Sequence, residues 1–293
     1  MAERITVITH WYNEELLAPL FLRHYAYVDE IRVLLETDTT DDTRLFLRMS
    51  PNVVVEDVHC AGGFDEMDKA ANINRAIGQI KEGWIYVVDA DEFIFPEHFE
   101  DPQTFLVRQT ASVVNAKLFF VFRHESDIDI NYEQDPLPQR VHGLDVSPTP
   151  WHLPDGRKRL RPERYWMIKL IVFRASADVV MGLGNHAAGR IGEPMFGRPH
   201  NFAWDGNAWV VTSGNTPIVV HAFSDERHIG AHWKLADLEI AMRRRLSNHM
   251  RLSACNIKHG YTVHELNINE FKIKQRHAEE MNHPISDCLV KKI

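Results

Sequence analysis

The sequence predicts an α/β fold with a mostly parallel central sheet flanked by helices. Three observations lead to this prediction: short β-branched segments alternate with longer amphipathic ones, polar clusters follow the β-branched segments, and the 293 residues are 44% hydrophobic. A chain of this length and composition can bury a large core. Strands that alternate with helices form βαβ units, whose ligands bind at the carboxyl ends of the strands.

The first two strands are expected near the amino terminus. Residues 5–9 are β-branched and apolar, and Asn13 then opens a helical stretch over 14–28. Residues 31–35 read as a second short apolar strand. The Thr/Asp cluster at 37–43 follows it, and its hydroxyls and carboxylates suit a turn and a cap for the next helix.

Two further strands complete the regular part of the pattern. Residues 52–58 supply the third strand, and apolar residues that recur on one face between 67 and 80 indicate a helix. Residues 84–88 supply the fourth strand, which leads directly into an acidic cluster. We expect these strands to lie parallel to one another, with their polar ends at one edge of the sheet.

Beyond residue 96 the pattern is less regular. A long strand is expected at 112–122, and shorter ones at 166–173 and 217–220. Residues 123–164 are rich in Pro, His, Asp and Arg with little periodicity, which indicates functional loops around a cleft. A long basic helix is expected from 225 to about 252.

Composition restricts the classes of function. A net charge of -8 gives no general attraction to nucleic acid or anionic lipid. Cys60, Cys255 and Cys288 are widely separated, which favours a reducing compartment over a disulfide framework or a zinc ribbon. The amino terminus lacks the apolar stretch of a signal peptide, and the apolar runs are shorter than the roughly 20 residues of a membrane-spanning helix. We expect a cytoplasmic protein, and the basic segment at 233–251 would suit contact with the inner face of a membrane.

The acidic cluster after the fourth strand is the main chemical signal. Asp89 and Asp91 are alternate residues, so both side chains can face one cation if the strand persists that far. With the neighbouring Glu92 they are hard oxygen donors suited to Mg²⁺ or Mn²⁺. A solvated acidic turn is the commoner explanation of such a pattern, but its place in the αβ series favours a metal site.

Three segments in this order resemble the motifs of family 2-like glycosyltransferases, which have the GT-A fold. They are HWYNEE at 10–15, ETDTTDDT at 36–43 and DADEF at 89–93. A later segment, HAFSDERHIGAHWK at 221–234, resembles more loosely an element that follows the catalytic domain in some bacterial branches. The resemblance implies a GT-A domain at 1–224, with a nucleotide-binding half at 1–96 and an acceptor-side half at 97–224, and a helical extension at 225–293.

The resemblance also implies an activity: transfer of a sugar from a nucleotide-diphosphate sugar, with UDP favoured, to an acceptor hydroxyl. A glycan, a lipid-linked glycan or another hydroxyl compound would serve as acceptor. Mn²⁺ or Mg²⁺ on Asp89 and Asp91 would neutralise the departing diphosphate, which gives Asp91 a catalytic role. The residues implied to bind the nucleotide sugar are Thr9, His10, Tyr12, Asn13, Glu14, Glu36, Asp41, Lys69, Asn72 and Asp89.

Several of these residues have simpler explanations. Tyr12 could be a core aromatic, Glu14 a charge in the first turn of a helix, and Lys69 a surface lysine. Glu36 departs from the family pattern, which usually has Asp there, by one methylene group.

A third metal ligand and a catalytic base are less well defined. The resemblance implies a late histidine on the metal, for which His186 and His221 are the candidates. His228 and His232 are four residues apart and are interpreted as an ordinary polar face of the long helix. An inverting reaction needs a carboxylate near the acceptor, and Asp127 and Asp129 are the candidates by position, against a solvated loop for either.

Three other functions are weighed against this one. A haloacid-dehalogenase-type phosphatase fits poorly, because three strands precede the acidic motif here and Phe93 follows it. A sugar-nucleotide nucleotidyltransferase would carry a glycine-rich basic loop after the first strand, where HWYNEELL has no glycine. A non-catalytic nucleotide-sugar-binding module is opposed by the intact Asp89 and Asp91 and favoured by the missing base. Stereochemistry, acceptor identity and oligomeric state are left open.

Overall fold

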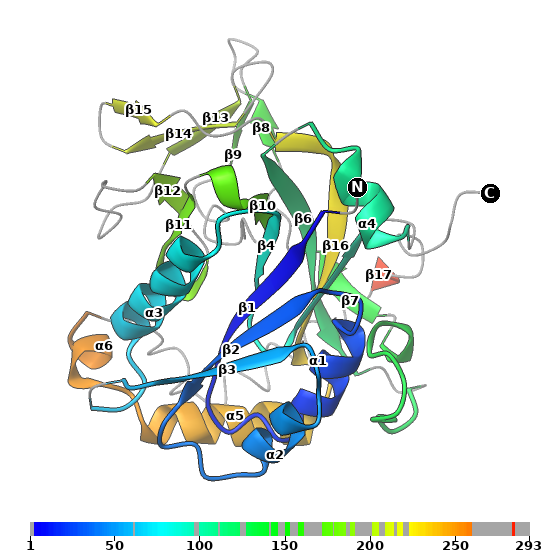
Figure 1. The fold of residues 1–293 in the computed structure, drawn as a ribbon, viewed down its shortest axis with the longest axis vertical. Helices are drawn as coiled ribbons and strands as arrows, with labels where there is room; N and C mark the ends of the chain where they lie inside the picture. The colour runs from blue at the N-terminus through cyan, green and yellow to red at the C-terminus, as the bar shows by residue number, and fades with distance from the viewer. Residues whose placement is uncertain are drawn as a thin grey trace.

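The structure is a computed structural model of the chain, shown in Figure 1. It describes the residues 3–60, 62–96, 100–110, 112–123, 127–140, 142–145, 150–152, 158–160, 172–177, 179–185, 188–190, 201–204, 209–213, 216–218, 223–259 and 283–284.

The amino-terminal third forms the parallel part of the central sheet. Its elements in chain order are β1 (Ile5–Trp11), α1 (Ala18–His24), β2 (Glu30–Glu36), α2 (Thr43–Arg48), β3 (Val53–Val58), α3 (Glu66–Gln79) and β4 (Trp84–Val87). The strands lie in the order β3-β2-β1-β4, and each neighbouring pair is parallel. The predicted α/β fold, with a mostly parallel central sheet flanked by helices, is confirmed.

The strands after β4 extend this sheet to ten strands within the described part of the chain. Beyond β4 the order continues β10-β6-β7-β17, with antiparallel pairing, and β16 pairs parallel with β6 and antiparallel with β5. These elements are β5 (Glu92–Pro96), α4 (Pro102–Val107), β6 (Val113–Phe122), β7 (His142–Asp145), β10 (Val172–Arg174), β16 (Phe223–Leu235) and β17 (His283–Pro284).

Shorter elements lie outside the central sheet. A five-stranded sheet has the order β15-β14-β13-β9-β8, and β11 and β12 form a separate antiparallel pair. Their bounds are β8 (Pro150–His152), β9 (Lys158–Leu160), β11 (Val179–Met181), β12 (Ala188–Arg190), β13 (Asn201–Trp204), β14 (Trp209–Ser213) and β15 (Thr216–Ile218). Short 3-10 turns occur at Leu137–Gln139, Ala175–Ala177 and Leu183–Asn185. Residues 123–164 were expected as loops, so β7, β8 and β9 are additional strands there.

The long helix expected from residue 225 begins later than predicted. Residues 225–235 belong to strand β16, and the helical part is α5 (Leu238–Met250) followed by α6 (Ala254–His259). The helix prediction for 225–235 is therefore wrong: pairing with β5 and β6 holds this segment extended, and the alternate residues Ile229, Ala231 and Trp233 are buried. Asp237 caps α5 by accepting hydrogen bonds from the backbone N–H groups of Glu239 and Ile240. The division of the chain at residue 224 stays a prediction.

Both faces of β1 are buried, because helices cover both sides of the sheet. Val7 and Trp11 pack on the side of α1, and Ile8 packs on the opposite side with Ile73 and Ile77 of α3. Among the helices of the described residues, none combines the length and apolar character that crossing a bilayer requires.

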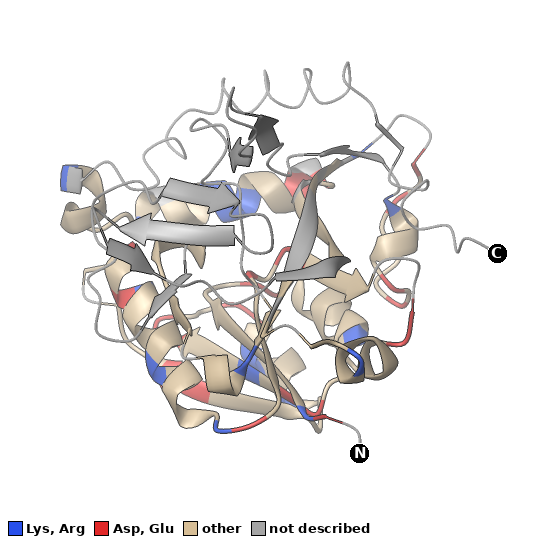
Figure 2. Ribbon diagram, turned by 90° about the horizontal axis from the view of Figure 1, so that it is seen from above, with Lys and Arg blue, Asp and Glu red and all other residues tan. Residues whose placement is uncertain are grey.

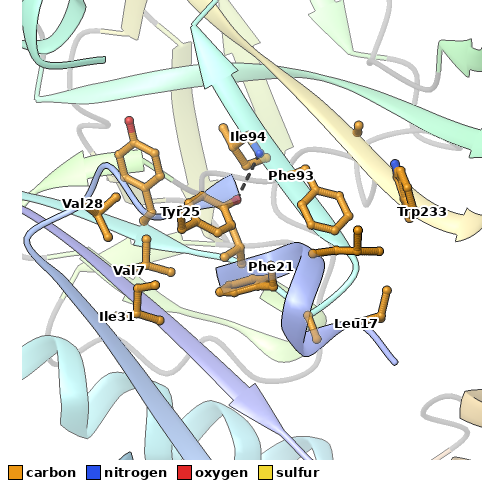
Figure 3. Close-up of a cluster of buried hydrophobic side chains, with 14 of the residues drawn as sticks. Val7, Leu17, Phe21, Tyr25, Val28, Ile31, Phe93, Ile94 and Trp233 are labelled. Carbon is orange, nitrogen blue, oxygen red and sulfur yellow. Dashed lines mark hydrogen bonds between the residues drawn. The ribbon is translucent and has the colours of Figure 1, made fainter. Parts of the chain in front are cut away.

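The core beside α1 also holds strands β5 and β16 in place. Figure 3 shows Phe21 of α1 facing Phe93 of β5, with Trp233 of β16 beyond it and Tyr25, the residue after α1, beside Ile94. The Tyr25 hydroxyl donates to the carbonyl oxygen of Glu92 (2.9 Å) and accepts from the backbone N–H of Ile94 (3.0 Å). The turn between β4 and β5, which carries the acidic cluster, is thus fixed by the packing of a helix and two strands.

Candidate active site

Polar segments from three parallel strands meet at one edge of the central sheet. The segment 10–15 ends β1, the segment 36–43 ends β2, and the acidic cluster at 89–92 ends β4. Helix α5 lies across the same edge (Figure 1). Because β2, β1 and β4 are adjacent and parallel, their carboxyl ends bring together side chains far apart in the sequence.

The loops after β1 and β2 are locked together by side chains. Asn13 adopts a left-handed backbone conformation (φ 52°), which Asn tolerates better than most residues. Its Oδ1 accepts from the backbone N–H of Thr40 (2.8 Å), and Asp41 Oδ2 accepts from the backbone N–H of Glu15 (3.0 Å). The Thr43 hydroxyl accepts from the backbone N–H of Glu14 (2.7 Å). Asn13 and Asp41 therefore shape this part of the site through backbone contacts.

Asp89 receives two donors on one oxygen. Lys69 Nζ of α3 donates to Asp89 Oδ1 over 2.8 Å, and Asn185 Nδ2 donates to the same oxygen over 3.0 Å. The exposed fraction of Lys69 is 9%, so it is not a surface lysine. The sequence did not indicate Asn185; its available signal was its place beside His186 in the turn GLGNHAAG, where it has a positive φ of 58°.

Asp91 lies at the centre of a buried ionic cluster. Its carboxylate bonds to Arg244 Nη1 of α5, and Oδ2 lies 3.2 Å from His232 Nε2 of β16. The backbone N–H of Trp233 donates to its carbonyl oxygen (2.7 Å). Burial alone would raise the pKa of Asp91, but the Arg244 guanidinium and His232 outweigh burial and hold the pKa well below its usual range. Asp91 is therefore ionised.

Glu14 completes this cluster from the end of β1. Arg244 Nε donates to Glu14 Oε1 over 3.0 Å, and Arg244 Nη2 lies 2.9 Å from the same oxygen. Burial raises the pKa of Glu14 to about 7, although Arg244 opposes the shift. One guanidinium group thus joins the carboxylates that end β1 and β4.

A second cluster lies at the ends of β1 and β2. Arg251 bonds to the Glu36 carboxylate, lies 3.0 Å from Asp38, and sits 3.2 Å above the centre of the Tyr12 ring. Burial raises the pKa of Glu36, and Arg251 opposes this shift. His10 Nδ1 lies 3.8 Å from Glu36 Oε1.

Cys60 extends this cluster on the other side of the histidine ring. Its sulfur lies 3.8 Å from His10 Nε2, and burial followed by the charge of Lys69 lowers the pKa of His10 to about 3. His10, Glu36 and Cys60 are close enough to share a metal ion. His10, however, turns a different ring nitrogen to each partner, so its ring lies between Glu36 and Cys60.

The segment that carries these arginines is anchored on the start of α3. The backbone N–H of Phe64 donates to the Arg251 carbonyl (2.6 Å), and the Ser253 hydroxyl donates to Asp65 (2.6 Å). Asn256 Oδ1 accepts from the backbone N–H of Glu66 (3.1 Å). Gly63 has a φ of 107°, and a Cβ atom there would collide with the Arg251 carbonyl oxygen, so glycine is required.

A cavity of about 170 Å³ lies between the loop after β1 and α5. It is lined by Asn13, Glu14, Glu15, Leu16, Asp41, Ile240, Arg243, Arg244 and Ser247. Helix α5 therefore covers the end of β1 without filling the space beneath it.

Acidic and basic residues are interspersed along the ribbon in Figure 2.

The structure corrects the interpretation of His228 and His232. Both lie on strand β16 and not on a helix, so they do not form an ordinary polar helix face. His232 reaches Asp91, and His228 is buried with its Nε2 2.9 Å from the Tyr86 hydroxyl. The other late histidines, His186 and His221, lie outside the described residues.

Other predicted residues lie in different surroundings. The Thr9 hydroxyl is buried and accepts from the Trp11 indole (2.7 Å), and Asn72 contacts Arg75 (3.4 Å). Asp127 lies 3.8 Å from the buried Arg140, whereas Asp129 is 95% exposed and bonds to Arg123 (2.8 Å). The roles proposed for Asp127 and Asp129 in the reaction stay predictions.

Fold and site together define an α/β protein with ionic clusters at the carboxyl edge of its parallel strands. Comparison with known proteins finds solved structures of partial likeness. S. aureus TarS 1–349 is 18% identical over 59% of this chain and 48% of its own, with a TM-score of 0.34. The same protein in complex with UDP-GlcNAc is 22% identical over 44% and 37%, with a TM-score of 0.31.

A further structure is glucosyl-3-phosphoglycerate synthase from Mycobacterium tuberculosis in complex with Mn²⁺, UDP and phosphoglyceric acid. It is 18% identical over 40% of this chain and 43% of its own, with a TM-score of 0.28. The chain covers less than half the length of each of these structures. No protein-family model and no curated protein matches the chain.

Proposed function

We propose that the chain transfers a sugar from a nucleotide-diphosphate sugar, with UDP favoured, to an acceptor hydroxyl. One observation carries this proposal: the segments 10–15, 36–43 and 89–93, which resemble the motifs of family 2-like glycosyltransferases, lie together at the carboxyl ends of β1, β2 and β4. In parallel α/β sheets this edge is where ligands bind. The domain organisation, cytoplasmic location and membrane contact expected from the sequence are part of the proposal.

The predicted Mn²⁺ or Mg²⁺ site agrees with the types of ligand present. Asp89 and Asp91 would hold the cation with a late histidine, either His186 or His221 as the resemblance implies, or His232, whose Nε2 lies 3.2 Å from Asp91 Oδ2; carboxylate oxygens and imidazole are ligands that Mn²⁺ accepts. In the described arrangement Lys69 pairs with Asp89 and Arg244 pairs with Asp91, and Asp89, Asp91 and His232 do not lie close enough together to share an ion, so binding of the cation requires these side chains to move. The bound ion would neutralise charge on the departing nucleoside diphosphate.

The chain's own residues would then have distinct tasks. Lys69 and Asn185 orient Asp89. Tyr12 and Glu36, both of which contact Arg251, are proposed to bind the nucleoside. A base for the acceptor hydroxyl is proposed from Asp127 and Asp129. The acceptor is proposed as a glycan, a lipid-linked glycan or another hydroxyl compound.

One observation favours a second candidate, a non-catalytic module that binds nucleotide sugars. Arg244 and Arg251 already engage Glu14, Asp91 and Glu36, so α5 holds the acidic groups in ion pairs. Binding of nucleotide without turnover of any donor would support this candidate.

The experiment is a panel of nucleotide sugars assayed with Mn²⁺ for hydrolysis and transfer, using the native chain and Asp91→Asn. We expect turnover with at least one donor, and a loss of about a hundredfold or more in Asp91→Asn, because several kcal/mol of charge stabilisation disappears. The control is Asp57→Asn, an exposed aspartate paired with Arg44 over 2.7 Å. Equal turnover by Asp91→Asn and the control would refute the role of Asp91.

A further inference from the structure

Helix α5 contributes an arginine to which neither the motifs nor the comparisons assign a task. Arg244 contacts Glu14 through Nε and Nη2, and Asp91 through Nη1. These residues lie 230 and 153 positions away along the chain. The exposed fraction of the Arg244 side chain is 24%, so an incoming ligand can reach it.

Arg244 and a divalent cation would compete for the same carboxylate. Asp91 Oδ2 accepts from Arg244 and also lies 3.2 Å from His232, one of the candidate metal ligands. Two cations held this close repel each other strongly in a buried site. A metal ion can therefore occupy Asp91 Oδ2 only when the guanidinium leaves that oxygen.

Phosphate is the other group that a guanidinium recognises well. Its five N–H donors form a planar fork, which matches two oxygens of a phosphate as well as two of a carboxylate. Under the proposed function the donor diphosphate lies next to Asp89 and Asp91, within reach of a guanidinium released from Asp91. The diphosphate can thus replace Asp91 as the hydrogen-bond acceptor for Arg244.

Arg251 gives an independent indication that this segment faces a ligand. It lies seven residues beyond Arg244 and bonds to Glu36 at the end of β2. Its Nη1 is buried and, within the part of the chain that the structure describes, has no hydrogen-bond partner. A buried donor of this kind is unfavourable unless an acceptor is supplied. The carboxyl-terminal segment therefore brings two guanidinium groups to the carboxylates at the ends of β1, β2 and β4.

We propose that Arg244 binds the diphosphate of the donor and that, before the donor arrives, it occupies Asp91 in place of a divalent cation. The identity of the donor rests on the proposed function. Binding of the diphosphate draws Arg244 away from Asp91 and frees this carboxylate for the metal. Donor and metal consequently bind cooperatively.

The test measures two affinities in the purified full chain. Mn²⁺ binding without nucleotide is followed by the electron paramagnetic resonance signal of the free ion, and UDP binding at saturating Mn²⁺ by calorimetry. In Arg244→Gln we expect Mn²⁺ to bind about tenfold or more tightly, because a competing charge is gone. UDP should bind about tenfold or more weakly, because a charge-assisted bond to phosphate is lost.

Two more variants make the result specific. Arg4→Gln removes a guanidinium that pairs with Glu30 at the opposite edge of the sheet, and both of its affinities should equal those of the native chain. Arg244→Lys keeps the charge without the fork, so Mn²⁺ binding should stay near the native value while UDP binding falls. If circular dichroism shows that Arg244→Gln does not fold, Arg244→Lys decides by its UDP affinity.

The opposing results are distinct. Unchanged or weaker Mn²⁺ binding in Arg244→Gln, or native UDP affinity in Arg244→Lys, would overturn the proposal and leave Arg244 a structural residue. If the native chain binds no UDP and turns over no nucleotide sugar, the proposed function fails. The Mn²⁺ titration then still decides whether Arg244 excludes a cation from Asp91.

Discussion

Asp89 shows how single contacts orient the site. Its Oδ1 accepts from both Lys69 and Asn185, which come from α3 and from the turn after β11. Two donors on one oxygen fix the direction of the carboxylate. Lys69 is thus a positioning residue, although its buried amine also lies close enough to lower the pKa of His10.

The Lys69→Met variant tests this role, because methionine keeps the length of the side chain without the charge. We expect UDP affinity at saturating Mn²⁺ to fall about tenfold, since loss of one hydrogen bond to a charged group weakens binding by roughly 1.5 kcal/mol or more. Calorimetry measures the affinity. Lys81→Met is the control, because Lys81 is exposed and donates to the Gly78 carbonyl at the end of α3. Equal losses in both variants would contradict the assignment.

At the scale of elements, the start of α3 is the anchor for the carboxyl-terminal helices. Asp65 caps α3 through the backbone N–H groups of Met67 and Asp68, and it also accepts from the Ser253 hydroxyl. Asp237 caps α5 in the same way through Glu239 and Ile240, and among the described residues it accepts hydrogen bonds from its own helix alone. The Asp65 cap therefore links α3 to the start of α6, whereas the Asp237 cap belongs to α5.

This difference predicts unequal effects on stability. Asp65→Ala should lower the free energy of unfolding by about 2 kcal/mol, the sum of a lost cap and a lost hydrogen bond between helices. Asp237→Ala should lower it by about 1 kcal/mol. Urea denaturation followed by circular dichroism measures both. A smaller effect for Asp65→Ala than for Asp237→Ala would mean that Ser253 does not hold α6 on α3.

At the scale of the whole molecule, buried histidines make stability depend on pH. Burial lowers the pKa of His228 to about 3, and burial followed by the charge of Lys69 does the same for His10. Below pH 6.5 these two histidines bind protons in the unfolded chain but not in the folded chain, so stability falls as the pH falls from 6.5 towards 3. Glu14 acts in the opposite direction: its raised pKa gives stability that is lost as the pH rises towards 7.

The His228→Gln variant isolates one of these groups. Between about pH 6 and 4 the free energy of unfolding of the native chain should fall more steeply than that of the variant, by up to about 1.4 kcal/mol per pH unit. The contribution of Glu14 is common to both and cancels. Urea denaturation at several pH values measures the slopes, with His59→Gln as the control because His59 is exposed. Parallel curves for the native chain and His228→Gln would refute the explanation.

The parts of the fold that local patterns define could be predicted from the sequence. The first four strands are short β-branched runs, and the polar ends of β1, β2 and β4 follow directly from their order. Strand β16 was missed although Ile229, Ala231 and Trp233 alternate along it, because the apolar residues that follow continue into α5 and the whole segment was interpreted as one helix. Its histidines were consequently assigned to the face of a helix.

The candidate site likewise contains residues that a local sequence pattern indicates and residues that it does not. Asp89, Asp91 and Glu14 lie at strand ends, where a sequence pattern can indicate them. Arg244 and Arg251 approach from more than 150 residues away, and a run of arginines in a helix is the same pattern whether it faces water or carboxylates. Their partners depend on how α5 packs, which no local signal specifies.

Strand β16 has a consequence for the order of events during folding. It pairs with β5 and β6, and its His232 meets Asp91 across 141 residues of chain. Closing a loop of this length is slow, because entropy is lost before the contacts that reward it are made. During synthesis the segment up to β4 emerges early, but the acidic turn gains its contacts with β16 only after residue 235 has left the ribosome. The nascent chain therefore exposes the free edges of β5 and β6 until that moment, and this interval is when it depends most on chaperones.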